Sequence, residues 1–305
     1  MRPINQEITD LKPAPENVGA VVVTYHPLPH FFKQIAALKS QIRNIIIIDN
    51  ASNEQARKNL EHISKELNIH LILNTRNLGV ATALNQGARC AIGHGYKWVL
   101  TFDQDTTAQE NMLSALREIY DSYEQKTKIA VIGSNYIDEK TNTIVHPISS
   151  DRKKTFKEVK TVITSGSLVS LEIYQKIGGF RDEFFIDAVD HEYCLKARHH
   201  GYKVLLSSMP LMKHPVGENT VHIPWLKLHI FNHSALRRYF MARNGMILSL
   251  EYLLRDPCWA LSRLFRLIAS IIVMCFHGGS VPKKLKYALL GIVDGILRNT
   301  QREII

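Results

Sequence analysis

The chain has 305 residues, of which 45% are hydrophobic and 22% are charged, a composition that is typical of a globular protein and excludes a disordered one. A core of the size that this length allows does not need disulfides or a structural metal in order to fold. The net charge of +10 is uneven, because residues 213–305 contain 13 of the 38 basic residues but only five of the 28 acidic ones.

The first half of the chain alternates short apolar runs with amphipathic stretches. Buried strands are predicted by the apolar runs at residues 18–24, 45–48, 69–73, 98–102 and 130–137. Helices are predicted by the apolar spacing at residues 29–41, 53–67, 81–92 and 109–123. Ser52 is the expected N-cap of the second helix, and Thr106 or Thr107 that of the fourth. This alternation predicts an α/β fold with a mostly parallel sheet and helices on both faces.

The pattern changes after residue 137. Residues 138–160 are polar and rich in turn formers, residues 162–169 are extended, residues 171–177 and 189–200 predict helices, and residues 203–207 predict a strand. The chain is then helical from about residue 231, with breaks at Pro257 and near residues 278–282. We therefore expect a polar extension at residues 1–17, an α/β domain at residues 18–230 and a basic helical region at residues 231–305.

Several features bear on the compartment. The cysteines show no C-x-x-C pair and no metal-type spacing, which predicts free thiols in a reducing environment; they are Cys90, Cys194, Cys258 and Cys275. The polar N-terminus has no apolar segment of a secretory signal. The longest apolar run, residues 267–276, is shorter than the ~20 residues of a spanning helix, so we expect no single helix to cross a bilayer. Together these features predict a cytoplasmic protein.

Polar side chains follow four of the predicted strands. They are Thr24 and Tyr25 after the first, Asp49 at the end of the second, Arg76 and Asn77 after the third, and Asp103 and Asp105 after the fourth. Ligands of such sheets bind outside the carboxyl ends of the strands. Function is therefore expected at this polar and partly acidic edge.

Asp103 and Asp105 form a D-x-D sequence at the end of a buried strand. Residues i and i+2 of an extended chain point the same way, so the two carboxylates offer an incomplete oxygen site for Mg²⁺ or Mn²⁺. The sequence has neither G-x-G-x-x-G after a strand nor G-x-x-x-x-G-K-[ST]. We therefore expect a divalent metal, rather than a glycine-rich loop, to hold substrate phosphates.

A series of segments occurs in one order: VVVTYHP, IIIIDNAS, RNLGVATALNQG, TFDQDT, TSGSLV and GGFRDEFFIDAVDHEYCLKARHHGY, followed by His214. Over residues 18–215 they resemble the inverting nucleotide-sugar glycosyltransferases of family 2, which have the GT-A fold. FDQD, TSGSL and FFID-x-VD-x-EYCL are most similar to bacterial rhamnosyltransferases of cell-surface polysaccharide assembly, such as that of O-antigen. The resemblance implies transfer of L-rhamnose from dTDP-L-rhamnose to a hydroxyl of a lipid-linked or growing glycan; a UDP-hexose is the alternative donor.

The resemblance also implies roles on the donor side. Asp49 would bind the pyrimidine base, Thr24 and Tyr25 would line the nucleotide pocket, and Arg76 and Asn77 would lie along it. Asp103 would lie near the sugar, Asp105 would bind the metal that carries the diphosphate, and His214 would be a further metal ligand. Neutral imidazole is a reasonable ligand for Mn²⁺.

On the acceptor side, Asp190 matches the family's catalytic base. Many relatives have Glu-Asp where this chain has Val189-Asp190, which weakens any statement about how the acceptor is oriented. Asp187 is the alternative base, and helix dipoles alone also favour acids in a first turn. The expected acceptor-side residues are Ser165, Gly166, Asp187 and Glu192.

The C-terminal region mixes basic and apolar side chains. Arg263 and Arg266 alternate with Trp259, Leu261 and Phe265, a pattern that favours a helix lying in the membrane interface. This predicts peripheral contact with the inner face of a bacterial cytoplasmic membrane. A helical subdomain packed on the sheet, or self-association into a homo-oligomer, explains the same pattern.

Two other classes of protein share some of these features. A nucleotidyltransferase would also have an α/β sheet and acidic metal ligands, but no glycine-rich basic loop follows the first strand. A basic nucleic-acid-binding module would suit the net charge, but phosphates without a metal would be repelled at the acidic edge. We therefore expect a glycosyltransferase with no nucleic-acid partner.

Overall fold

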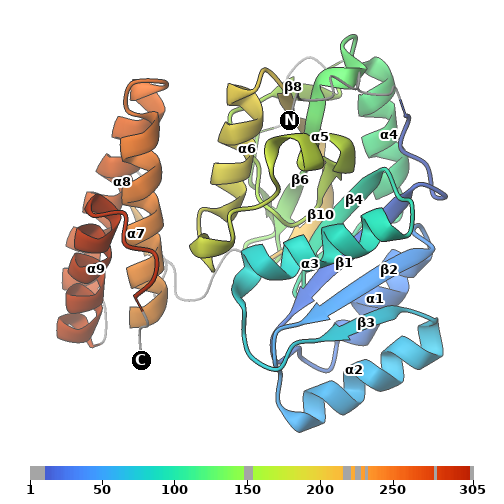
Figure 1. The fold of residues 1–305 in the computed structure, drawn as a ribbon, viewed down its shortest axis with the longest axis horizontal. Coiled ribbons are helices and arrows are strands. Elements are labelled where there is room, and N and C mark those ends of the chain that lie inside the picture. Colours follow the sequence, from blue (N-terminus) through green and yellow to red (C-terminus); the bar gives the residue numbers. More distant parts are fainter. Residues whose placement is uncertain are drawn as a thin grey trace, which may run out of the picture. The chain divides into compact units, whose positions relative to one another are not determined.

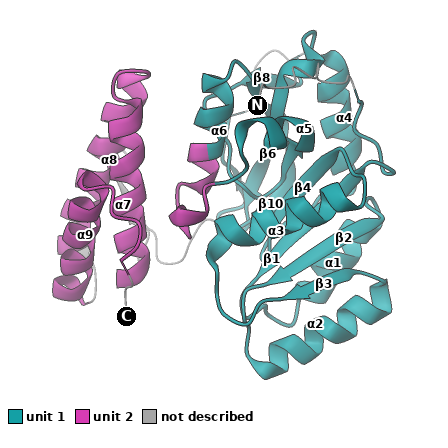
Figure 2. Cartoon of the chain, in the orientation of Figure 1, with its two compact units in different colours: residues 1–180, 193–215 teal, residues 181–192, 216–305 magenta. Residues whose placement is uncertain are grey.

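The chain divides into two compact units (Figure 2). A computed structural model of the chain describes residues 11–147, 154–215, 221–223, 228–230, 233–277 and 280–302. Unit 1 consists of Met1–Phe180 and Tyr193–Pro215, and unit 2 consists of Arg181–Glu192 and Val216–Ile305. The short segment Arg181–Glu192 thus groups with the C-terminal helices, although its sequence neighbours on both sides belong to unit 1.

Unit 1 contains a parallel half-sheet, which lies in the blue and teal part of Figure 1. Its strands run in the order β3 (His70–Leu73), β2 (Asn44–Asp49), β1 (Val18–Thr24) and β4 (Trp98–Asp103). Because crossovers between parallel strands are right-handed, this strand order places α1 (Phe31–Lys39) and α2 (Glu54–Leu67) on one face and α3 (Gly79–Gly93) on the other. Every residue of β1 is buried, as a sheet covered on both faces requires.

The rest of the sheet is mixed. β9 (Ser167–Ser170) lies antiparallel between β4 and β6 (Ile129–Asp138), and β6 pairs in parallel with β10 (Lys203–His214). Short antiparallel strands complete it; these are β5 (Thr107–Ala108), β7 (Thr143–Ile144) and β8 (Phe156–Glu158). The expected α/β sheet is confirmed, but parallel pairing is limited to β1–β4 and to β6 with β10. β9 runs antiparallel because the chain returns from β6 without a crossover helix.

The helices expected after β4 are present as α4 (Met112–Ser122), α5 (Leu171–Ile177) and α6 (Val189–His199). Two 3₁₀ helices that were not predicted are η1 (Lys126–Lys128) and η2 (Asp182–Phe184), and η2 belongs to unit 2. α3 packs closely on β1 because a Cβ at Gly87 would lie 2.3 Å from Cγ1 of Val21, so only glycine allows the approach. The strand order reverses between β1 and β4, which is where an open α/β sheet forms a ligand crevice.

Two expected helix caps were wrong. α2 begins at Glu54 with Asn53 as its N-cap, whose Oδ1 accepts from the amide of Ala56 at 2.9 Å. Ser52 is not available for capping because its hydroxyl and amide both bind Asp49. Thr106 and Thr107 do not cap α4 either, because Thr107 lies in β5 and the hydroxyl of Thr106 contacts His214.

Unit 2 is built on a helical layer. α7 (Ala235–Tyr252) packs against both α8 (Pro257–His277) and α9 (Val281–Ile296), and a two-stranded ribbon pairs β11 (Val221–Ile223) with β12 (Leu228–Ile230). Small residues allow the helices to approach, since a Cβ at Gly291 would lie 2.4 Å from the carbonyl oxygen of Tyr239. The helical C-terminal region and its break at Pro257 are therefore confirmed.

One helix differs from the expectation about membranes. Within the described residues, Pro257–Cys275 of α8 form a 19-residue stretch of mean hydropathy 1.7 that is long and apolar enough to cross a membrane, and only 17% of it is buried. The expectation that no single helix crosses a bilayer stays a prediction, but the apolar run on which it was based was measured too short. It counted uninterrupted apolar residues, whereas Arg263 and Arg266 interrupt the run without making the average polar.

Candidate active site

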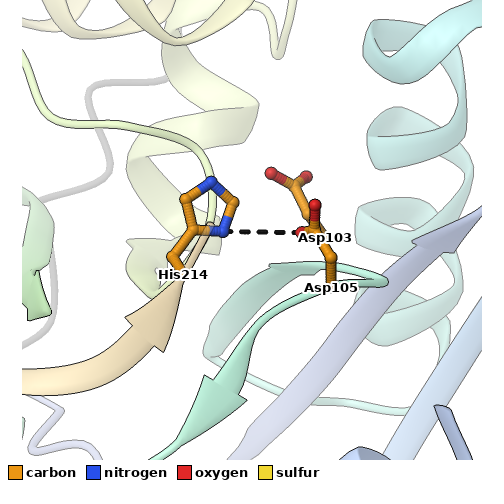
Figure 3. Close-up of side chains that lie close together, drawn as sticks. All are labelled: Asp103, Asp105 and His214. Carbon is orange, nitrogen blue, oxygen red and sulfur yellow. Dashed lines mark ion pairs between the residues drawn. The ribbon is translucent and has the colours of Figure 1, made fainter. Parts of the chain in front are cut away.

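Asp103, Asp105 and His214 lie together at one edge of the sheet of unit 1 (Figure 3). Asp103 is the last residue of β4, Asp105 follows in the turn to β5, and His214 is the last residue of β10. Their ligand atoms all lie within 4.8 Å of one another, and Nδ1 of His214 is 3.5 Å from Oδ1 of Asp105. Two carboxylates and an imidazole are a donor set that fits Mn²⁺, or Mg²⁺ with phosphate oxygens added. The three residues expected to surround a metal are therefore brought together.

A chain of buried hydroxyl groups supports Asp103 and His214. The amide of Asp103 donates to Oγ of Ser165 at 3.0 Å, and that oxygen lies 2.6 Å from Oγ1 of Thr106. Oγ1 of Thr106 in turn lies 2.8 Å from Nδ1 of His214. Hydrogen bonds of this kind fix the tautomer and the orientation of a metal-binding imidazole. Thr106 thus belongs to the candidate site, whereas the sequence analysis interpreted it as a helix cap; its position directly after the D-x-D sequence was the available signal.

Ser165 and Gly166 form a turn beneath the D-x-D sequence. Gly166 has a φ of 70°, and a Cβ there would lie 2.4 Å from Sδ of Met212, so this position requires glycine. Its amide donates to the carbonyl of Thr101 at 2.7 Å, and its carbonyl accepts from the hydroxyl of Ser134 at 2.7 Å. Both residues are buried, and Ser165 contacts Asp103 directly. Their expected contact with an acceptor stays a prediction.

Asp49 joins the ends of β1 and β2. Its carboxylate is fully buried and accepts from the hydroxyl of Thr24 at 2.9 Å and from the hydroxyl and amide of Ser52 at 2.5 and 2.9 Å. An ionised carboxylate has about four lone-pair sites, so three accepted bonds leave room for one further donor. These hydrogen bonds therefore fix the side chains of Asp49 and Thr24 next to the half-exposed Tyr25.

The middle residue of the D-x-D sequence has a structural role of its own. The amide of Tyr25 donates to Oε1 of Gln104 at 2.7 Å, and Nε2 of Gln104 donates to the carbonyl of Tyr25 at 3.1 Å. This pair of bonds links the end of β1 to the turn that carries Asp103 and Asp105. The sequence analysis treated Gln104 as a spacer, because a glutamine between two aspartates carries no local signal.

Arg76 and Asn77 follow β3 at the same edge. Arg76 is exposed, and Oδ1 of the half-buried Asn77 accepts from the amide of Gly79 at 2.9 Å, where α3 begins. Thr24, Tyr25, Asp49, Arg76, Asn77 and Asp103 therefore all lie at the carboxyl ends of the adjacent strands β1 to β4. Arg76 provides an exposed positive charge there, as a diphosphate would require.

The acidic residues Asp187, Asp190 and Glu192 belong to unit 2. Asp190 lies in the first turn of α6, where its Oδ1 accepts from the amide of His191 at 2.7 Å. Asp187 accepts from Arg237 of α7, with Nε to Oδ2 at 3.2 Å and Nη2 to Oδ1 at 3.4 Å. Burial raises the pKa of Asp187, and the charge of Arg237 opposes this shift. The positive charge of Arg263 in α8 interacts with both aspartates.

The sequence of this chain is similar to those of known proteins. Residues 20–178, which are just over half of the chain, match the family described as glycosyl transferase family 2. The chain belongs to glycosyltransferase family 2. It is 29% identical over 293 residues to the dTDP-rhamnosyl transferase RfbF of Shigella flexneri, and the match covers 92% of this chain and 95% of that one. The predicted class of enzyme is confirmed, and the nucleic-acid-binding alternative is set aside.

Solved structures share the fold of this family 2 glycosyltransferase. A mannosyltransferase of Pyrobaculum calidifontis in complex with GDP-Man and Mn²⁺ matches with a TM-score of 0.56 and 14% identity, over 95% of this chain and 90% of that one. Residues 1–349 of S. aureus TarS in complex with UDP-GlcNAc match with a TM-score of 0.59 and 14% identity, over 93% and 82% of the two chains. These matches confirm the GT-A type of fold.

Proposed function

We propose that this glycosyltransferase moves L-rhamnose from dTDP-L-rhamnose to a hydroxyl of a lipid-linked or growing bacterial surface glycan, with inversion at the anomeric carbon. The observation that carries the proposal is the gathering of Asp103, Asp105 and His214 at the carboxyl edge of the sheet. The choice of donor rests on the near end-to-end similarity to a dTDP-rhamnosyl transferase.

Each strand end has a part in donor binding. Asp103, Asp105 and His214 would hold Mg²⁺ or Mn²⁺, which offsets the negative charge of a diphosphate leaving group. Asp49 accepts the ring N–H of the thymine through its remaining lone pair, and Tyr25 covers the nucleotide. Arg76 and Asn77 lie along the nucleotide pocket.

Asp190 acts as the base. The acceptor oxygen bonds to the anomeric carbon while the bond from that carbon to the diphosphate oxygen breaks. The proton of the acceptor passes to the carboxylate of Asp190, and the electron pair leaves with dTDP. Asp187 is less suited to this role because Arg237 already engages both of its oxygens. Asp190→Asn should lower transfer at least ~100-fold, to a residual rate that can still be measured, yet preserve dTDP binding; full activity would assign the base to Asp187 or another group.

We also propose that α8 attaches the enzyme to the cytoplasmic face of the bacterial membrane, where a lipid-linked acceptor lies. Four large apolar residues repeat at helical spacing along α8 and are each more than half exposed; they are Leu261, Phe265, Ile268 and Ile272. Arg263 lies on another side of the helix and interacts with Asp187 and Asp190. A helix with one exposed apolar face and one charged, packed face is suited to lie in the interface rather than to cross it.

A thermal-shift screen of nucleotides tests the donor. A ligand that binds only the folded state raises its stability by RT ln(1 + [L]/Kd), so binding is measured without an acceptor. We expect dTDP and dTDP-rhamnose to stabilise the protein more in Mn²⁺ or Mg²⁺ than without metal, and more than UDP or GDP ligands do. A preference for UDP ligands would retain the enzyme class and replace rhamnose. A lack of response to all of them would contradict the proposed donor site.

A further inference from the structure

The backbone that leads into Asp190 is strained. Phe185, Asp187 and Ala188 have φ values of 54°, 65° and 61°, which are unfavourable for residues with a Cβ. At Phe185, a ψ of −66° and a 2.5 Å bond from the amide of Ile186 to the carbonyl of Phe184 form a tight turn of the rare, strained γ type. Such a conformation persists only where the surroundings enforce it.

Asn244 of α7 provides that enforcement. Its side-chain nitrogen lies within hydrogen-bond distance of three carbonyls of the strained backbone, those of Phe184 at 2.8 Å, Ile186 at 2.9 Å and Asp187 at 2.9 Å, so that one of its two N–H groups is shared between two of them. The side chain of Asn244 is fully buried, so water does not compete for these bonds. The side-chain amide of Asn244 thus stabilises a backbone conformation in which these carbonyls point toward one atom. In an extended chain they would point in different directions.

Arg243 fixes the orientation of that amide. Its Nε donates to Oδ1 of Asn244 at 3.0 Å, which turns the nitrogen of the amide toward the three carbonyls. Nη2 of Arg243 donates to the carbonyl of Glu183, one residue before the strained stretch. The guanidinium lies 4.9 Å from the ring centre of Phe240, and that ring stacks on Phe185 at 5.0 Å. The pair therefore holds both the backbone and the side chain at the γ-turn.

We propose that Arg243 and Asn244 are positioning residues for transfer: they hold residues 184–188 in the strained shape that presents Asp190 to the acceptor. The inference rests on the proposed function, because it takes Asp190 as the base. It explains why Arg181–Glu192 groups with the C-terminal helices instead of with the sheet that binds the donor. It also gives α7 a role in the reaction that is independent of membrane contact.

The first test compares variants of two buried polar residues of α7. Asn244→Ala removes the bonds to the strained backbone, whereas Ser249→Ala removes a hydroxyl whose bond, to the carbonyl of Gly245, stays within the helix. The assay measures dTDP release from dTDP-L-rhamnose in Mn²⁺, with a panel of octyl glycosides and with water alone as acceptor. Asn244→Ala should lower kcat at least ~10-fold, since small misplacements of catalytic groups have effects of this size. Ser249→Ala should stay within about twofold of wild type, and dTDP binding should be unchanged in both.

A double-mutant cycle separates positioning from general destabilisation. If Asn244 acts through Asp190, Asn244→Ala in an Asp190→Asn background should cause no further loss of rate. A structural effect would instead add to the loss. Should Asn244→Ala unfold, Asn244→Ala with Ala188→Gly replaces it, because glycine adopts the positive φ at position 188 without strain.

The outcomes distinguish the inference from the function on which it rests. A wild-type rate with Asn244→Ala, or an additive loss in the cycle, overturns the positioning role while transfer by Asp190 stands. Full activity of Asp190→Asn overturns the base and with it the inference. A wild-type enzyme that binds dTDP but releases none from dTDP-L-rhamnose contradicts the proposed donor.

Discussion

The hydroxyl of Thr106 lies 2.8 Å from Nδ1 of His214 and 2.6 Å from the hydroxyl of Ser165, so one buried oxygen joins His214, a proposed metal ligand, to the turn that contacts Asp103. The single hydroxyl of Thr106 can donate to one of these two neighbours and accept from the other. The position of His214 therefore depends on a residue that is not itself a ligand.

Thr106→Val should weaken metal binding while keeping the fold. Valine has nearly the same shape but cannot hold the imidazole, and loss of such partners typically lowers metal affinity 10- to 100-fold. We expect the Mn²⁺ concentration for half-maximal stabilisation by dTDP to rise by about that factor. Thr107→Val, at the half-buried neighbour in β5, is the matched control and should bind metal as the wild type does. Equal metal affinity in the two variants would remove Thr106 from the site.

Asp105→Ala should remove the dependence on metal altogether. The side chain of Asp105 is 49% exposed, so its removal should change the free energy of unfolding by no more than about 0.5 kcal/mol. Transfer should fall at least ~100-fold, because metal stabilisation of a leaving group contributes several kcal/mol. Titration of dTDP by thermal shift, with and without Mn²⁺, measures the same loss without an acceptor. The exposed Glu110→Ala is the control, and normal turnover in Asp105→Ala would contradict the metal site.

The sequence was sufficient to predict the long strands and helices of unit 1 because their signals are local, but it did not predict the short strands β5, β7 and β8. β1 and β2 are short valine- or isoleucine-rich runs bounded by polar residues, and the polar residues after each strand mark its carboxyl end. The roles of Asp49 and His214 came from resemblance, since no local pattern states that these residues meet at one edge. Ser52 was predicted to be an N-cap because it directly precedes the predicted helix. In the structure its hydroxyl instead donates to the buried carboxylate of Asp49.

The contacts of unit 2 were beyond sequence reasoning for a different reason. Asn244 and Phe184 are 60 residues apart, and neither has a composition that signals the other. The segment FFIDAVDHE reads as an apolar turn followed by an acid-rich helix start, which does not reveal a backbone with three positive φ values. Long-range hydrogen bonds to carbonyls do not change the hydrophobic periodicity of a sequence. The contacts between α7 and this segment could therefore be found only in the structure.

The carboxylate of Asp294 should make the free energy of unfolding depend on pH. Its buried carboxylate accepts from Nε and Nη2 of Arg302 at 2.5 and 2.9 Å and from the hydroxyl of Tyr239 at 2.9 Å. The hydrogen bond from Arg302 is the main cause that lowers the pKa of Asp294. A lowered folded-state pKa adds stability above the unfolded value of about 3.9, and this stability is lost as the pH falls through the folded value.

Two variants measure that contribution. Asp294→Asn should lower the free energy of unfolding at pH 7 by about 1–3 kcal/mol, as loss of a buried charged hydrogen bond does. Its Tm should also fall less than that of the wild type between pH 5 and pH 3, because the carboxylate that titrates is gone. Arg302→Ala should show the same flattened profile, and the exposed Glu61→Gln should not. Parallel pH profiles for wild type and Asp294→Asn would contradict this account.

The apolar face of α8 leads to the prediction about membranes. Phe265 and Ile268 are 54% and 56% exposed, so glutamate at both positions should leave the helix folded. Burial of a large apolar side chain contributes roughly 1.5–3 kcal/mol, so loss of two such side chains should weaken partitioning onto anionic vesicles at least ~10-fold. Met209→Glu, on β10 of unit 1 and 57% exposed, is the matched control and should sediment with vesicles as the wild type does. Wild-type protein that stays in the supernatant would contradict membrane attachment. The alternative is that the wild type is a dimer and that the double variant Phe265→Glu with Ile268→Glu is a monomer. In that case self-association explains why this face of α8 is apolar, because a second copy buries an apolar helix face as lipid does.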